Sequence, residues 1–124
     1  MIDHVSIGVR DFARARAFYD AVFATLGGKA HHAGDDYAGY GRAAPVYWVQ
    51  VSERPVPADM ASGLHFCFAA DTRAQVDAFH AAGLALGGTD NGPPGLRLNY
   101  GPDYYAAFVI DPDGYRIEAH THAP

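Results

Sequence analysis

Apolar and polar residues alternate over the first nine positions of the chain. A period of two is typical of a strand with one buried face, so residues 2–9 are predicted to form a strand. One face carries Val5, Ile7 and Val9, and the other carries His4, Ser6 and Gly8. Asp11 is then placed to cap a helix, whose apolar residues recur at helical spacing until the double glycine at 27–28. The pattern predicts a helix over residues 11–26.

The second half of the chain repeats this order of elements. A shift of 61 positions superposes His4 on His65, Phe18 on Phe79 and Gly27 on Gly88. Residues 64–69 alternate again, with Leu64, Phe66 and Phe68 on one face and His65, Cys67 and Ala69 on the other. Thr72 and Gln75 match a helix capping box, and a second double glycine follows the second helical pattern. This internal duplication predicts that both halves form the same unit.

Three strand-like segments follow each helix. They cover residues 28–33, 36–41 and 45–52 in the first half, and 95–100, 103–110 and 115–120 in the second. The turn sequence Asp111-Pro112-Asp113-Gly114 predicts a hairpin between the last two strands. Residues 54–62 read as a proline-containing connector, and 89–95 as a Gly/Pro loop. We therefore predict a single α+β domain over 1–124, built from two βαβββ modules at about 1–53 and 63–124.

Composition narrows the classes of partner. A chain of 124 residues and 13.3 kDa, with 49% apolar and 19% charged residues, suits one packed domain. Its net charge of −5 and pI near 5.7 give no electrostatic reason to bind nucleic acid or an anionic membrane. Cys67 is the only cysteine, so no internal disulfide forms. No apolar stretch approaches the ~20 residues of a membrane helix, and no signal sequence is evident, so we expect a cytoplasmic protein.

Candidate chemistry comes from three distant strands. The large apolar side chains of the two repeated strands are expected to pack on their helices, which turns His4 and His65 to the opposite face. On the last strand, Ile117 and Ala119 are the natural core positions, so Glu118 shares that opposite face. Two imidazoles and one carboxylate thus point away from the helices.

These residues carry a family resemblance that covers essentially the whole chain. Gly63-Leu64-His65-Phe66 and the closing Asp111-Pro112-Asp113-Gly114-Tyr115-Arg116-Ile117-Glu118 resemble the vicinal oxygen chelate superfamily. That superfamily contains glyoxalase I, bleomycin resistance proteins and extradiol dioxygenases. The resemblance implies that the two modules form one cup-shaped, eight-stranded mixed sheet, and that the protein is a homodimer.

The resemblance also implies a divalent metal ion held by His4, His65 and Glu118, with Glu118 as the catalytic carboxylate. Fe, Mn, Ni, Zn and Co all suit two imidazoles and a carboxylate, which leave coordination sites for substrate oxygens. The expected activity is lyase, isomerase or dioxygenase chemistry on a small oxygenated organic substrate. In glyoxalase I a second glutamate stands where this chain offers Trp48 or Gln50, so the ligand set is closer to that of the extradiol dioxygenases. The alternative is a metal-free, homodimeric small-molecule or antibiotic-binding protein.

Several further side chains are candidates for the substrate pocket. Aromatic residues give a ligand apolar walls with an occasional hydroxyl group, and Arg97 and Asn99 share one face of the expected 95–100 strand. The candidates are Trp48, Gln50, Cys67, Arg97, Asn99, Tyr104 and Tyr105, with Tyr100 as a further aromatic. The alternative roles are core packing or a dimer interface for the aromatic residues, solvent exposure for Arg97 and Asn99, and buried packing for Cys67.

Overall fold

The computed structural model describes residues 1–124, and each half of the chain folds as a strand, a helix and three strands. The first module contains β1 (Val5–Val9), α1 (Phe12–Thr25), β2 (Lys29–Ala33), β3 (Tyr37–Gly41) and β4 (Tyr47–Val51). The second contains β5 (His65–Ala69), α2 (Arg73–Ala85), β6 (Thr89–Leu96), β7 (Tyr105–Ile110) and β8 (Arg116–Thr121). A segment that includes the short 3-10 helix η1 (Met60–Ser62) joins them. The predicted α+β class and the repeated βαβββ order are confirmed.

The helices begin where the sequence places their caps. The Asp11 carboxylate accepts a hydrogen bond from the amide of Arg14, and the Thr72 hydroxyl accepts one from the amide of Gln75. The Gln75 side chain in turn accepts a hydrogen bond from the amide of Asp71, at 2.7 Å. Neither helix is both long and apolar enough to cross a membrane.

The eight strands form two separate four-stranded sheets rather than the single sheet that the family resemblance implied. Their orders are β1-β4-β3-β2 and β5-β8-β7-β6, and in each sheet the first pair is parallel while the others are antiparallel. No hydrogen-bonded strand pair joins one sheet to the other. The two modules are therefore joined by packing and not by a shared sheet.

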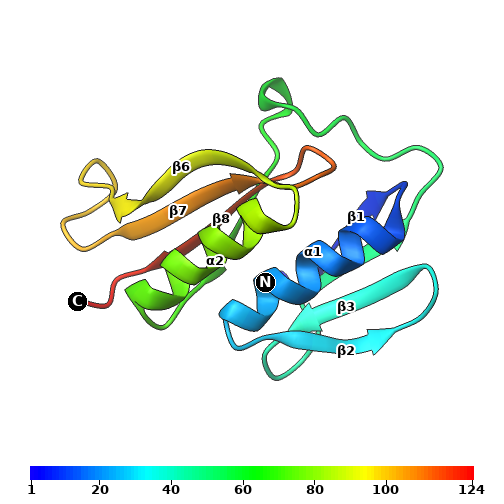
Figure 1. Ribbon diagram of the computed structural model, residues 1–124, viewed down its shortest axis with the longest axis horizontal. Coiled ribbons are helices and arrows are strands. Elements are labelled where there is room, and N and C mark those ends of the chain that lie inside the picture. The colour runs from blue at the N-terminus through cyan, green and yellow to red at the C-terminus, as the bar shows by residue number, and fades with distance from the viewer.

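A common hydrophobic core holds the modules together. In Figure 1 α1 and α2 run side by side, with β2 and β3 to one side of the pair and β6 and β7 to the other. The ring of Phe68 on β5 lies 4.9 Å from that of Phe23 on α1 and 5.1 Å from that of Tyr47 on β4. Buried apolar side chains of both sheets and both helices form one cluster, so the two modules share a core.

The segment between α2 and β7 differs from its prediction. Residues 89–96 form strand β6, where a loop was expected over 89–95. Residues 97–104 form a loop, although strands were expected over 95–100 and from residue 103. Pro93 and Pro94 are tolerated because β6 is an edge strand, and its pairing with β7 is irregular around Gly92. Glycines and prolines on a bulged edge strand resemble a loop in sequence, which is why their presence predicted a loop here.

The predicted 111–114 turn is confirmed, and it also contacts the first module. The Asp111 carboxylate accepts hydrogen bonds from the backbone amides of Asp113 and Tyr115, which fixes the turn. The Tyr115 hydroxyl donates to the carbonyl oxygen of Gly8 at 2.7 Å, and Arg14 on α1 pairs with Asp113 at 2.9 Å. The turn therefore ties the last hairpin to β1 and α1.

Candidate functional site

Three side chains of the second module meet on the face of its sheet that points away from the helices. The register of β5 and β8 pairs Cys67 with Glu118 and places His65 one step along the same face. The Nε2 atom of His65 lies 3.0 Å from Oε2 of Glu118, and the Tyr104 hydroxyl donates to Oε1 of Glu118 at 2.7 Å. Ile117 and Ala119, on either side of Glu118, are fully buried in the core, as predicted. The alternation of β8 thus presents Glu118 to the open face.

A cavity of about 470 Å³ opens over this cluster. Its walls combine three aromatic rings with polar and charged groups, and its lining residues are His65, Asn91, Tyr100, Tyr104, Phe108, Arg116 and Glu118. Glu118 is only 3% exposed, whereas His65 is exposed at the mouth of the cavity. A buried carboxylate beside an accessible imidazole is suited to bind a cation or to exchange a proton with a ligand.

Shifted pKa values favour the neutral forms of Tyr104, Cys67 and His120, which lie near Glu118. Burial, together with the hydrogen bond to Glu118, raises the pKa of the Tyr104 hydroxyl. The pKa of the Cys67 thiol rises to about 12, because its sulfur is packed among neighbours and lies beside the Glu118 carboxylate. The residue as a whole is nevertheless exposed. Burial and the neighbouring His122 lower the pKa of His120, whose ring stacks on Tyr104 at 4.0 Å. Cys67 is therefore a thiol at neutral pH and is not activated as a nucleophile.

His4, the third predicted ligand, does not join this cluster within one chain. It lies just before β1, its side chain is 53% exposed, and its Nδ1 atom lies 2.6 Å from the carboxylate of Asp3. No three His, Cys, Asp or Glu side chains of the chain lie close enough together to hold a metal ion. The structure thus brings together His65 and Glu118 and leaves His4 apart.

The other predicted pocket residues are dispersed. Trp48 lies on the first module, where its ring stacks 6.1 Å from that of His32, and Gln50 lines a groove between β1 and the connector. Tyr105 faces α2, where its hydroxyl donates to Asp77 at 2.7 Å, because adjacent strand residues point to opposite faces.

Arg97 and Asn99 do not share a strand face, because both lie in the 97–104 loop. The guanidinium group of Arg97 stacks 5.3 Å from the centre of the Phe108 ring, and Asn99 is exposed. Of the seven predicted pocket residues, only Tyr104 lines the cavity over Glu118, and Cys67 lies beside it.

Phe108, Arg116 and Asn91 also line the cavity, although the sequence did not predict them as pocket residues. A signal for two of them was present. Phe108 is four residues after Tyr104 in the strand predicted over 103–110, and Arg116 lies on the same face of β8 as Glu118. Asn91 carried no such signal, because the irregular pairing of β6 shifts its register. The Arg116 side chain is anchored by a hydrogen bond from its Nε to the carbonyl oxygen of Leu64, at 3.2 Å.

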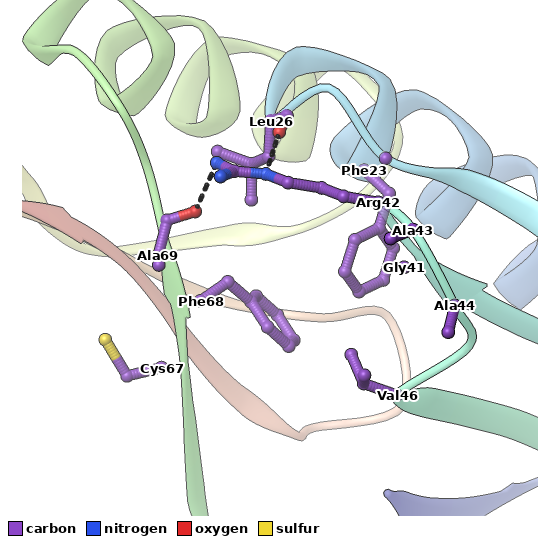
Figure 2. Close-up of a pocket in the computed structure, with 11 residues that line it drawn as sticks. Phe23, Leu26, Gly41, Arg42, Ala43, Ala44, Val46, Cys67, Phe68 and Ala69 are labelled. Carbon is purple, nitrogen blue, oxygen red and sulfur yellow. Dashed lines mark hydrogen bonds between the residues drawn. The ribbon is translucent and has the colours of Figure 1, made fainter. Parts of the chain in front are cut away.

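A second cavity, of about 440 Å³, lies between the modules and is chemically different (Figure 2). Its walls include Phe23, Leu26, Val46 and Phe68, and Figure 2 shows Cys67 turned away from the Phe68 ring. Its only charged side chain, Arg42, donates to the carbonyl oxygens of Leu26 and Ala69 and pairs with Asp71, each at 2.9 Å. The cavity therefore offers apolar surface and no acid, base or free cation.

Comparisons with known proteins agree with this fold. Residues 1–119 match the family model of the Glyoxalase/Bleomycin resistance protein/Dioxygenase superfamily. None of the curated proteins compared with the chain matches it. A crystal structure of a glyoxalase/bleomycin resistance protein from Albidiferax ferrireducens is 38% identical, with a TM-score of 0.82, over 95% of this chain and 96% of that chain.

Two more distant structures share the fold. A glyoxalase/bleomycin resistance protein/dioxygenase family enzyme from Burkholderia phytofirmans is 20% identical, with a TM-score of 0.73 over 98% of each chain. The fosfomycin resistance protein FosX from Mesorhizobium loti is also 20% identical, with a TM-score of 0.70 over 98% of this chain and 91% of that chain. The extent of the family match and the 38% identity show that this chain belongs to the Glyoxalase/Bleomycin resistance protein/Dioxygenase superfamily.

Proposed function

We propose that this protein is a metal-dependent enzyme of the vicinal oxygen chelate type, acting on a small oxygenated organic substrate by lyase, isomerase or dioxygenase chemistry. The observation that carries the proposal is the 3.0 Å separation between Nε2 of His65 and Oε2 of Glu118. Two donors at right angles on one ion, each about 2.1 Å from it, are about 3.0 Å apart. The pair therefore fits neighbouring positions on one divalent ion, which Fe, Mn, Ni, Zn or Co would supply.

The residues around the pair have separate parts in this proposal. A bound divalent ion supplies Lewis acidity to the substrate oxygens. His65 and Glu118 hold the ion, and Glu118 is the carboxylate closest to a bound substrate. The rings of Tyr100, Tyr104 and Phe108 form apolar walls for a bound substrate.

The third ligand in this proposal is His4 of a second copy of the chain. The residues of β5 that point away from the helices, His65, Cys67 and Ala69, are exposed, so the sheet face that carries the site is uncovered. The apolar cavity between the modules lies beside it, and Val46 at its edge is 49% exposed. A twofold homodimer that places the first module of one copy over the second module of the other would cover both surfaces and complete two cups.

Metal binding tests the proposal directly. Purified protein dialysed against Mn(II), Fe(II), Ni(II) or Zn(II) and then against metal-free buffer is expected to retain one ion per chain in elemental analysis. His65→Ala and Glu118→Ala are expected to weaken binding at least 10-fold, because each removes a ligand. His31→Ala and Asp77→Asn, which change a histidine and a carboxylate outside the cavity, serve as controls. A wild-type protein that retains no stoichiometric metal contradicts the proposal.

A second candidate function is metal-free binding of a small molecule or an antibiotic. It is favoured by the three aromatic rings that line the cavity and by the presence of only two clustered metal-ligand side chains within one chain. This candidate predicts that His4→Ala leaves ligand affinity unchanged, whereas Tyr100→Ala and Phe108→Ala, each of which removes an aromatic wall of the cavity, weaken it. Titration of the three variants with a bound drug or fragment separates the two functions.

A further inference from the structure

Glu118 has a different partner on each of its two carboxylate oxygens. Oε1 accepts the hydrogen bond from the Tyr104 hydroxyl at 2.7 Å, while Oε2 lies 3.0 Å from Nε2 of His65. Because Glu118 is only 3% exposed, water does not compete strongly for either oxygen. Side chains of the second module alone therefore fix the positions of both carboxylate oxygens of Glu118.

We propose that Tyr104 is a positioning residue that makes Glu118 a one-oxygen ligand, which binds through Oε2. This inference rests on the proposed function. A free carboxylate can rotate and chelate an ion with both oxygens, whereas one whose Oε1 is held by a hydroxyl group presents only Oε2. Hydrogen bonds to a ligating carboxylate commonly fix its orientation in this way.

Tyr104 is itself held in place by its neighbours. Its ring stacks on His120 at 4.0 Å, and the rings of Tyr100 and His122 meet it edge-on at 5.2 and 5.6 Å. His122 is in turn 3.1 Å from the carboxylate of Asp103. A hydroxyl group delivered by a packed ring loses little conformational entropy when it forms its hydrogen bond.

Tyr105 provides a matched control for this role. Its hydroxyl also donates to a carboxylate at 2.7 Å, but the acceptor is Asp77 on α2, on the other side of the sheet. Tyr104→Phe and Tyr105→Phe therefore remove the same atom and the same kind of hydrogen bond from adjacent positions. Only the first change affects Glu118.

Crystal structures of the two variants, grown without added metal, test the positioning. In Tyr104→Phe the Glu118 carboxylate is expected to occupy more than one conformation, with the contact to His65 lost in part of the molecules. In Tyr105→Phe both are expected to stay as in the wild type. A single, unchanged Glu118 conformation in Tyr104→Phe overturns the inference.

Mn(II) affinity, measured by electron paramagnetic resonance, tests the consequence. Tyr104→Phe is expected to weaken Mn(II) binding about 10- to 100-fold, the usual effect of removing a hydrogen bond to a ligand, and Tyr105→Phe to leave it unchanged. Equal affinity in both variants and the wild type overturns the inference. If the wild type binds no metal, the proposed function fails, whereas the Glu118 conformation in the crystals still decides the role of Tyr104.

Discussion

At the scale of single residues, Asp111 combines burial with a contact between the modules. It is 3% exposed, and its Oδ2 accepts a hydrogen bond from the hydroxyl of Tyr19 on α1, which also contacts the hydroxyl of Tyr47 on β4 at 3.1 Å. Burial raises the pKa of Asp111 to about 6, against the opposing effect of the Tyr19 hydrogen bond. The sequence identified this aspartate as part of a turn, but gave no sign that its carboxylate is buried against the first module.

We expect Asp111 to make the stability of the protein depend on pH. Its pKa is about 6 in the folded protein and about 3.9 in the unfolded chain, so between these values the folded protein binds more protons. The free energy of unfolding contributed by this group is therefore complete below pH ~4 and is lost as the pH rises through ~6. The loss is on the order of 3 kcal/mol. Urea unfolding of the wild type and Asp111→Asn at pH 4, 5, 6 and 7 measures it.

The difference in free energy of unfolding between the wild type and Asp111→Asn isolates the effect of the Asp111 carboxyl group. Asp111→Asn should not show the decrease in the free energy of unfolding that Asp111 causes in the wild type. The free energy of unfolding of the variant should therefore rise relative to that of the wild type as the pH increases from 4 to 7. Asp35→Asn, at an exposed position, should follow the wild type at every pH. Parallel curves for Asp111→Asn and the wild type would show that Asp111 does not titrate in this range.

At the scale of elements, the turn between β7 and β8 shows how a glycine decides whether a hairpin can dock. Gly114 has φ of +97°, and a Cβ atom built there would lie too close to the carbonyl oxygen of Ala58 in the connector. Gly27, at the end of α1, also has a positive φ, of +74°, but has open space around it. Gly27 therefore needs glycine only for its backbone conformation, whereas Gly114 needs it also because a side chain would clash with the connector.

Substitution by alanine distinguishes these two needs. Gly27→Ala is expected to lower the free energy of unfolding by about 1 kcal/mol, the cost of a left-handed backbone for a side-chain-bearing residue. Gly114→Ala carries that cost and a backbone clash as well, which adds about 1–3 kcal/mol. Thermal or urea unfolding of both variants measures the difference. Equal losses would mean that the connector moves aside without cost.

At the scale of the whole molecule, the repeat has the same fold in each module but different chemistry. The second module holds His65, Glu118 and their cavity, whereas the matching face of the first module carries Trp48 packed on His32. His4 is the only predicted ligand contributed by the first module. Whether it completes a site is therefore a question about two chains.

Mixing two defective variants tests a shared site. In the proposed homodimer, a hybrid of His4→Ala and Glu118→Ala contains one site with all three ligands intact and one site that lacks two of them. The mixture, after dissociation and reassociation, is expected to bind about one ion per four chains, although each variant alone binds weakly. Size-exclusion chromatography with light scattering should give twice 13.3 kDa for the wild type. If mixing restores no binding, His4 does not complete the site across two chains.

The sequence by itself determined the order of elements, the duplication and part of the site. Helix caps at Asp11 and Thr72, the alternation of β5 and β8, and the 111–114 turn are local patterns, and local patterns are set by backbone geometry within a few residues. The face shared by His65 and Glu118 followed from the same alternation, once the family resemblance suggested which strands lie together.

Only the tertiary structure decided how the two modules meet. Phe68 packs on Phe23 and Tyr47, so the two modules share one core. Their strands form two separate sheets, and His4 stays away from Glu118. The edge position of β6 allowed Pro93 and Pro94 within a strand and moved Arg97 and Asn99 into a loop. Contacts between distant segments depend on packing geometry, which the spacing of residues along one chain does not record.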